Sequence, residues 1–309
     1  MIPTGVIPIY KPPGMTSHDV VSKVRRLAGI RRVGHTGTLD PDVAGVLPVC
    51  LGQATRIVEY VQELPKRYHG TMTLGKATDT QDRSGRVIEE KAVDSLQPEK
   101  IEQVFRSFQG EIEQVPPMVS AVKVGGRRLY EWAREGKVVE RKPRRITIYE
   151  LKITGLNLEE AFPQIHFDVL CSRGTYVRTL CVDIGAALGY PAHLSQLTRV
   201  QSGPFFLEDT VTLDDLQQMA ANGNWEDVLY PIDAVLGNFP TLLVPVDKKL
   251  RVWNGEFLSW EQPLETSLVN QLVRVYTEAG EFCAIYRVID PCTAQPEKVF
   301  RGGAAHADL

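Results

Sequence analysis

The densest group of residues able to do chemistry lies in the segment GHTGTLDPDVAGVLP, which runs from Gly34 to Pro48. One imidazole, His35, precedes one carboxylate, Asp40, by five residues, and the surrounding glycines permit close backbone approach and unusual dihedral angles. A carboxylate presented in this way can serve as a covalent nucleophile. The segment lacks the G-K-[ST] ending of a phosphate-binding P-loop. Spacing alone favours a simpler role, a tight connection in which Asp40 forms an Asx turn.

A metal-dependent phosphoesterase is a second interpretation, with ligands drawn from four His and Asp residues: His35, Asp40, Asp79 and Asp82. No recognisable Cys, Asp or His spacing completes a metal site, which opposes this interpretation. The cysteines number five and none are spaced C-x-x-C, so neither a disulfide framework nor a zinc site is indicated. This cysteine usage fits a reducing, cytoplasmic compartment.

Charge is distributed unevenly along the chain. The net charge of −3, taken alone, argues weakly against a nucleic-acid partner. Residues 1–39 nevertheless hold six Lys and Arg against one Asp, and residues 121–150 hold nine against four Glu, a local balance of +5 in each case. A phosphate backbone responds to local charge, so these basic segments admit RNA as a partner, with solvated surfaces as the alternative. No apolar run approaches the roughly 20 residues that span a bilayer, so no membrane partner is expected.

The elements that must position these residues mix strands and helices. A strand is predicted at Gly5–Tyr10, and Thr16 or Ser17 caps a helix that ends at Gly29. Periodicity predicts further strands at 68–74, 145–153 and 164–170, and helices at 54–62, from 98 onward and at 177–188. Residues 113–142 combine prolines, paired glycines, much of one basic segment and a short helix at 129–134, which is typical of a functional insertion. From residue 239, short apolar runs between turns predict a small all-β domain.

Six motifs, in order along about the first two-thirds of the chain, resemble those of bacterial TruB-family tRNA pseudouridine synthases. They are YKPPGMTS (Tyr10–Ser17), the segment from Gly34 to Pro48, KRY (Lys66–Tyr68), TDTQD (Thr78–Asp82), SRGTYVRTL (Ser172–Leu180) and HLSQLTR (His193–Arg199). The resemblance implies an α+β fold with a mixed-sheet catalytic domain over residues 1–238. Within it, residues 113–142 would form a thumb-like RNA-binding insertion. Residues 239–309 resemble, less distinctly, a small β-rich PUA-like RNA-binding domain.

The same resemblance implies that the chain isomerises uridine to pseudouridine at position 55 in the T-loop of tRNA. This reaction breaks a glycosidic C–N bond and forms a C–C bond without exchanging electrons or groups with another molecule, so no cofactor and no metal are expected. Asp40 is implied as the nucleophile, toward C1′ of the sugar or C6 of uracil. Arg178 is implied as its ionic partner, held from the other side by Asp82, and Tyr68 as the catalytic aromatic residue. Asp42 adds a carboxylate that is expected to raise the pKa of Asp40.

Substrate contacts are implied for nine residues: Lys11, His35, Asp82, Arg127, Arg128, Arg141, Lys142, Tyr176 and Leu197. Tyr176 and Leu197 would form walls around a flipped-out nucleotide, and His35 would fill the space that the extruded base leaves. The basic residues of the thumb would contact phosphates. The expected partner is the T-arm stem-loop of tRNA, bound by a monomer without an obligate protein partner.

Two rival functions remain beside this one. The first is the catalytic subunit of an RNA-guided pseudouridylation complex, which resembles this family but lacks the thumb, so residues 113–142 favour a stand-alone enzyme. The second is a tRNA-folding chaperone in which catalysis is secondary or absent. The joint presence of Asp40, Tyr68 and Arg178 opposes the chaperone hypothesis.

Overall fold

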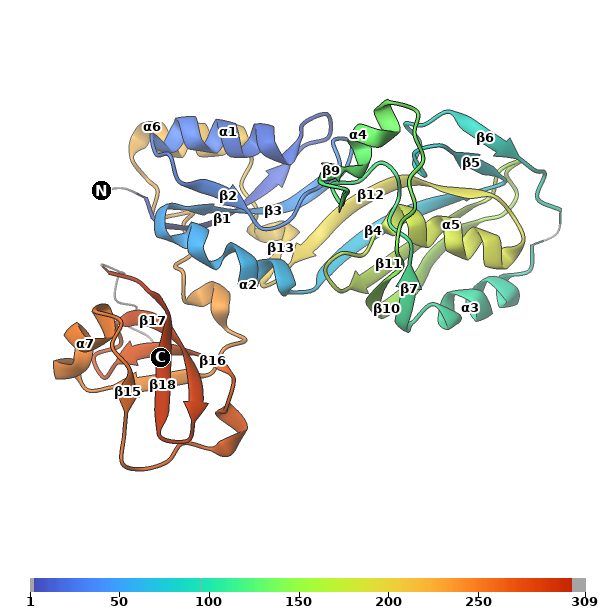
Figure 1. The fold of residues 1–309 in the computed structure, drawn as a ribbon. Helices are drawn as coiled ribbons and strands as arrows, with labels where there is room; N and C mark the ends of the chain where they lie inside the picture. The colour runs from blue at the N-terminus through green and yellow to red at the C-terminus, as the bar shows by residue number, and fades with distance from the viewer. Residues whose placement is uncertain (1–2, 95, 302–309) are drawn as a thin grey trace.

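A mixed nine-stranded sheet forms the body of the computed structural model, which describes residues 3–94 and 96–301 (Figure 1). Its main path runs in the order β1 (Gly5–Lys11), β3 (Ala44–Leu51), β12 (Ala192–Ser202), β4 (Lys66–Leu74), β11 (Gln164–Cys171), β10 (Arg144–Asn157) and β7 (Gly110–Gln114). Two short strands extend it, β2 (Val33–His35) beside β3 and β13 (Phe205–Phe206) beside β12. Strand β12 runs parallel to β3 but antiparallel to β4, which confirms the predicted α+β class with a mixed sheet.

Two helix pairs cover the two halves of this sheet, each over its own apolar core. Helices α3 (Pro98–Ser107) and α5 (Val177–Leu188) pack on strands β4, β10, β11 and β12, whereas α1 (Ser17–Ala28) and α6 (Leu213–Asn222) pack on β1 and β3. The predicted limits of α1 are confirmed, because the Thr16 hydroxyl caps its start and Gly29 ends it in the left-handed conformation. None of the described helices is both long and apolar enough to cross a membrane.

Five strands between residues 241 and 299 form a second sheet, in agreement with the predicted β-rich C-terminal part. Its order is β14 (Thr241–Val244), β16 (Leu272–Thr277), β17 (Phe282–Asp290), β18 (Thr293–Val299) and β15 (Leu258–Ser259), with α7 (Lys249–Trp253) packed beside it. The two sheets share one apolar cluster, which contains Phe282 of β17 and Phe300, just after β18, together with Val46 and Ile57 from the first part of the chain. The C-terminal sheet is therefore anchored through a common core.

The segment 113–142 begins with the last two residues of β7 and continues as a small excursion toward β10. A two-stranded hairpin, β8 (Lys123–Val124) and β9 (Arg127–Arg128), turns at Gly125 and Gly126, both with positive φ. Helix α4 (Leu129–Arg134) follows and matches the short helix predicted there. The segment stands out in green around α4 in Figure 1.

Several strands were not predicted. The glycine-rich connection 33–48 contains β2 and the start of β3, and residues 76–78 and 87–90 pair as a hairpin of β5 and β6. The largest omission is β12, which lies near the centre of the sheet. Register shifts at residues 194–196 and 199–201 interrupt its two-residue alternation, so its sequence lacks the clear strand signal of β4.

The shared core predicts a strong effect at Phe282, which is 4% exposed and stacks on Phe300. We expect Phe282→Ala to lower the free energy of unfolding by about 3–5 kcal/mol, because a large buried ring is lost and a cavity remains. Phe257→Ala, which removes a ring that is 57% exposed, is the matched control and should change it by less than about 0.5 kcal/mol. Equal, small effects of both in denaturant titrations would show that the second sheet is not anchored here.

Candidate active site

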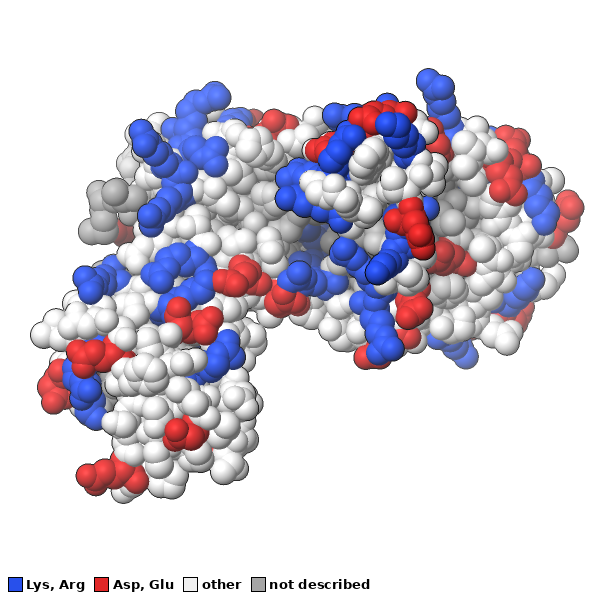
Figure 2. Space-filling model, viewed as in Figure 1, with Lys and Arg blue, Asp and Glu red and all other residues white. Residues whose placement is uncertain are grey.

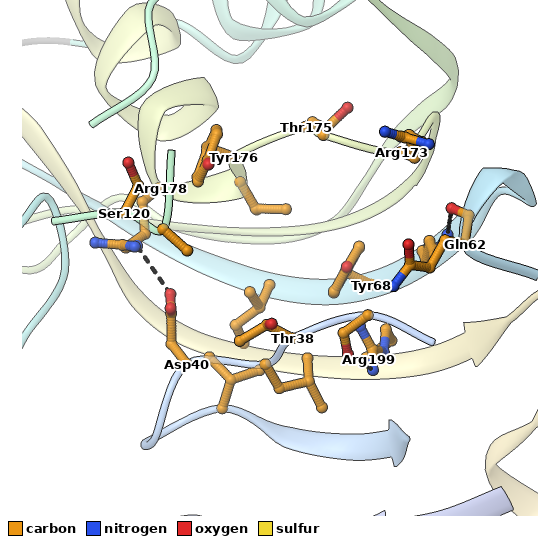
Figure 3. A pocket seen from close by; sticks show the side chains of 18 of the residues that line it. Thr38, Asp40, Gln62, Tyr68, Ser120, Arg173, Thr175, Tyr176, Arg178 and Arg199 are labelled. Carbon is orange, nitrogen blue, oxygen red and sulfur yellow. Dashed lines mark hydrogen bonds and ion pairs between the residues drawn. The ribbon is translucent and has the colours of Figure 1, made fainter. Parts of the chain in front are cut away.

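A pocket of about 320 Å³ opens where the two halves of the sheet meet (Figure 3). Tyr68 and Leu197 line it and pack against both apolar cores, which places the pocket at their seam. Asp40 and Arg178 lie at one end of the pocket in Figure 3. They also line a neighbouring chamber of about 450 Å³, so their side chains stand between the two spaces. Sequence motifs that are far apart along the chain thus converge on one cavity.

The loop that carries Asp40 is fixed on both sides of this residue. Before it, the Ser17 hydroxyl accepts a hydrogen bond from the Leu39 N–H at 2.9 Å. After it, the Pro41 carbonyl accepts hydrogen bonds from the Gly14 N–H and from the Lys11 ammonium, both at 2.9 Å. The N-terminal motif YKPPGMTS therefore acts on the loop, because its side chains and backbone set the position of the carboxylate.

Lys11 is a correction to the predicted substrate contacts. Its side chain is fully buried, and its ammonium donates to the carbonyls of Pro12, Met15 and Pro41. All three N–H donors are thereby used, and none remains for a substrate. Burial also lowers the pKa of Lys11 to about 8. Lys11 is a positioning residue for the Asp40 loop.

Arg178 joins three segments at one guanidinium. Its Nε lies 3.0 Å from the Asp40 carboxylate, its Nη1 donates to the Thr80 carbonyl, and its Nη2 donates to the Val119 carbonyl, both at 2.9 Å. Asp82 lies on the other side, 3.7 Å from Nη1. The structure thus brings together the predicted Asp40, Arg178 and Asp82, and the side chain of Arg178 is only 6% exposed.

The pKa of Asp40 is raised above its ordinary value of 3.8, and burial is the main cause. The positive charge of Arg178 opposes this shift, while the nearby Asp82 carboxylate adds to it. Asp42 was expected to supply the neighbouring negative charge, but its side chain is exposed and Asp82 fills that role. The Asp40 side chain is 45% exposed and paired with one buried cation, so its carboxylate can reach a bound group, as a nucleophile requires.

Tyr68 and Tyr176 line the pocket from different elements. Tyr68 lies on β4, and burial raises the pKa of its hydroxyl although the Arg199 guanidinium opposes the shift. Tyr176 precedes α5, and its backbone is held by the side chain of Gln114. The Gln114 amide oxygen accepts a hydrogen bond from the Tyr176 N–H, and the Gln114 amide nitrogen donates one to the Tyr176 carbonyl. Leu197 lines the same pocket, so the structure brings these three predicted residues together.

Two buried cations in the pocket were missed as site residues. Arg199 is 1% exposed and donates to the carbonyls of Val46 and Gly37, so it braces the Asp40 loop from β12. Lys66 is 6% exposed and donates to two backbone carbonyls near the end of α2 (Val58–Glu63). Both residues belong to motifs that the sequence analysis recognised, KRY and HLSQLTR, and that membership was the available signal.

The close approach of β12 also explains one glycine of the loop motif. Gly45 pairs with Arg199, and a Cβ on it would lie 2.1 Å from the Arg199 carbonyl oxygen. Its φ of +117° is unfavourable for other residues as well. Glycine at this position therefore allows the parallel strand pair that joins the two halves of the sheet.

His35 lies on β2 and lines neither of the two chambers. Its Nδ1 accepts a hydrogen bond from the Gly37 N–H at 3.2 Å. Burial and the charge of Arg199 lower its pKa, which favours the neutral ring. The residues described by the structure contain no group of three or more His, Cys, Asp or Glu side chains placed to share a metal ion, so the ligand set of the phosphoesterase hypothesis does not assemble.

The basic residues of segment 113–142 differ in availability. Arg127 stacks on Trp132 and pairs with Glu135, and Arg141 donates to the Pro116 carbonyl. The other two predicted contacts are exposed on the surface: Arg128 and Lys142. In Figure 2, blue Lys and Arg side chains gather over α4 and β9, with red Glu side chains among them, and a second blue group lies over α1.

The raised pKa of Asp40 predicts a pH-dependent effect on stability. The Asp40 carboxyl loses its proton at the ordinary pKa in the unfolded chain but only at a higher pH in the folded protein. The free energy of unfolding therefore falls as pH rises from the unfolded-state pKa of Asp40 to its folded-state pKa. Asp40→Asn removes this loss, so its free energy of unfolding relative to the unmodified protein should rise as pH increases above the ordinary pKa of 3.8. Asp42→Asn, at an exposed side chain, is the control for the removed charge. A relative stability that falls over the same range in denaturant titrations would contradict the raised pKa.

Comparisons with known proteins agree with this geometry. Residues 25–177 match the family described as "TruB family pseudouridylate synthase (N terminal domain)", and residues 178–248 match "tRNA pseudouridylate synthase B C-terminal domain". The chain is 49% identical over 304 residues to a tRNA pseudouridine synthase B of Geobacillus thermodenitrificans, covering 96% of this chain and 99% of that protein. It is 40% identical to one of Staphylococcus aureus strain MSSA476, with the same coverage.

Solved structures share the fold over almost the whole chain. A chain of a Cbf5-Nop10-Gar1 complex superposes with a TM-score of 0.74 at 30% identity, covering 96% of this chain and 85% of that one. A chain of an H/ACA RNP bound to a substrate RNA containing 2′-deoxyuridine gives 0.72 at 27% identity, covering 97% and 86%. With two family matches across residues 25–248 and relatives of this identity along nearly its full length, the chain belongs to the TruB family of pseudouridylate synthases.

Proposed function

We propose that this protein isomerises uridine to pseudouridine in tRNA, at position 55 of the T-loop. The observation that carries the proposal is the Asp40–Arg178 ion pair, with Nε and carboxylate 3.0 Å apart beside a pocket lined by Tyr68 and Leu197, in a member of a pseudouridylate synthase family. Relatives at 40–52% identity that are named tRNA pseudouridine synthase B support tRNA as the substrate.

In this function Asp40 is the nucleophile and Arg178 keeps it ionised. Burial alone would protonate more of the carboxylate, and the guanidinium counters that tendency at 3.0 Å. Asp82 orients Arg178 from the far side, while the carbonyls of Thr80 and Val119 fix its other nitrogens. An oriented nucleophile lowers the entropic cost of reaching the transition state.

The target uridine must leave its stack to reach Asp40, because an enzyme cannot react with C1′ inside a stacked loop. Tyr68 supplies an aromatic face for the flipped base, and Tyr176 and Leu197 supply the remaining walls. His35 is neutral and lies beside the loop rather than in the pocket, which suits a contact with the RNA that the base has left.

Recognition of the rest of the tRNA is divided among three parts of the chain. Residues 1–238 form the catalytic domain, residues 113–142 form the thumb over the T-arm, and residues 239–309 form a PUA-like RNA-binding domain. The exposed Arg128 and Lys142 support phosphate contacts by the thumb. The protein acts as a monomer in the cytoplasm.

The rival functions receive less support. The solved chains that belong to RNA-guided complexes are 27–30% identical to this chain, whereas relatives named as tRNA pseudouridine synthase B reach 40–52%. A chaperone would not require a carboxylate paired to a buried arginine, because binding alone gains nothing from the cost of burying the guanidinium. Incubation of the purified protein with unmodified tRNA transcript and mapping of pseudouridine separates these functions directly.

Asp40→Asn should abolish single-turnover pseudouridine formation, because the amide has nearly the same volume but is not a nucleophile. Binding of tRNA should persist. Asp40→Glu keeps the charge but displaces it by about 1 Å, which should reduce the rate roughly 10²-fold or more. Near-normal turnover by Asp40→Asn would refute the assigned mechanism. Loss of tRNA binding together with turnover would instead indicate a misfolded loop.

Arg128→Gln and Lys142→Gln should each weaken tRNA binding and lower the slope of log K against log salt by roughly 0.7–0.9, as one phosphate contact is lost. The single-turnover rate at saturating protein should change little. Arg127→Gln is the matched control within the same segment, because Glu131 and Glu135 already pair with this guanidinium. An unchanged slope in the Arg128→Gln, Lys142→Gln double variant would remove the thumb from the RNA interface.

A further inference from the structure

Lys66 and Arg199 are positive charges inside the pocket without a carboxylate partner. Both are more than nine-tenths buried, and among residues 3–94 and 96–301 no Asp or Glu lies within ion-pair distance of either. Their donors go to backbone carbonyls, and Arg199 also makes a hydrogen bond with the Tyr68 hydroxyl. The other two cations that line the pocket are by contrast paired, Arg178 with Asp40 and Arg173 with Glu63. Lys66 and Arg199 thus make up an unneutralised cationic end of the pocket.

The two side chains converge on one place. Lys66 precedes Tyr68 by two residues on β4, and Arg199 is the cross-strand neighbour of Tyr68 on β12, so all three share one face of the sheet. A Cβ on Gly37 would lie 3.6 Å from Nη1 of Arg199 and 3.9 Å from Cε of Lys66, which brings both side chains against the same loop residue. Figure 3 places Arg199 across the pocket from the Asp40–Arg178 pair, with Tyr68 beside Arg199.

A buried cation without a counter-ion is unfavourable, and proteins usually pair or neutralise such groups. Burial and the charge of Arg199 lower the pKa of Lys66 to about 8, so Lys66 remains mostly protonated at neutral pH. Arg199 stays charged under all ordinary conditions. Two persistent charges in a weakly solvated site indicate that an anion occupies this end of the pocket at some stage of the reaction.

The proposed reaction generates such an anion. When Asp40 attacks C1′, a C1′–O bond forms, the C1′–N1 bond breaks and its electron pair leaves with uracil. The negative charge thereby moves from the carboxylate to the uracil ring, where N1 and the two carbonyl oxygens share it. When C5 later attacks C1′, the ester bond breaks and the charge returns to Asp40. The C5 proton is lost and N1 gains one, so the overall change is an isomerisation.

We propose that Lys66 and Arg199 stabilise the negative charge on the detached uracil, as the cationic end of the pocket opposite Asp40. This inference rests on the proposed function and adds an electrostatic role for residues that the nucleophile does not touch. Fixed charges aimed at the site where charge develops are among the largest contributions to catalysis. The same cations also oppose escape of the detached base, since an anion between them is held electrostatically.

A phosphate of the RNA backbone is the alternative anion. The depth of the two side chains argues against it, because Lys66 and Arg199 are 6% and 1% exposed. More exposed cations are available to a phosphate: Arg173 at the pocket, 56% exposed, and basic residues on the thumb and on α1. A backbone phosphate stays near the protein surface, whereas a flipped base enters the pocket. The two assignments also differ in their measurable consequences, since phosphate contacts change affinity and salt dependence.

The experiment compares Lys66→Met with the unmodified protein on stem-loops carrying uridine or 4-thiouridine at the target position. Sulfur spreads negative charge better than oxygen, so the thio base needs less help as a leaving group. Single-turnover conversion, followed by nuclease digestion and separation of the isomeric nucleosides, should fall about 10²-fold on uridine. On 4-thiouridine the loss should be at most about 10-fold. RNA affinity and its salt slope should stay unchanged.

Lys66→Arg should recover most of the rate because it keeps the charge. Arg199→Lys, which also keeps the charge but shortens the planar group, should show the same substrate pattern with a smaller loss and covers the case in which Lys66→Met does not fold. Lys100→Met, at an exposed lysine of α3, is the control for charge removal and should change neither rate. Equal losses on both substrates would overturn the inference, as would a lowered salt slope with an unchanged chemical step. Absence of pseudouridine with the unmodified protein would refute the proposed function itself.

Discussion

The pairing of Arg178 with Asp40 is the interaction on which the active site depends. One buried guanidinium binds the carboxylate at 3.0 Å, the Thr80 carbonyl and the Val119 carbonyl. Through these contacts the Asp40 loop, the TDTQD segment and the base of the thumb are fixed relative to α5. A buried arginine keeps its positive charge, so removal of one of these partners would leave that charge incompletely compensated and destabilise the site. The position of the nucleophile is thus coupled to the segment proposed to bind RNA.

The site exists because the sheet carries two separate cores. Tyr68 and Leu197 contact both, and the strands that hold them, β4 and β12, lie side by side near the centre. The parallel pairing of β12 with β3 requires Gly45, where any side chain would strike the Arg199 carbonyl. A seam between two rigid helix-covered halves leaves room for a base while each wall remains backed by packed side chains.

Much of this arrangement could be predicted from the sequence, for identifiable reasons. Helix α1 carries a capping threonine and a terminal glycine, and the motif residues Asp40, Arg178 and Asp82 were recognisable without knowing their distances. Strand β12 escaped prediction because bulges disrupt its alternation. Lys11 was assigned to substrate because sequence does not reveal that three carbonyls surround its ammonium. The boundary between the two domains stays a prediction, although both sheets share the cluster around Phe282.

Charge within the pocket follows the course of the proposed reaction. At the Asp40 end, one arginine lies between two carboxylates, so a net negative charge remains there in the free protein. At the opposite end, Lys66 and Arg199 carry positive charge that the free protein leaves unneutralised among its described residues. Transfer of an electron pair from carboxylate to uracil would neutralise that second end while Asp40 becomes an uncharged ester. The free-energy cost of burying these unpaired cations in the free protein is thus recovered only when negative charge has moved onto uracil. An interaction gained only at that stage lowers the barrier to reaction instead of tightening substrate binding.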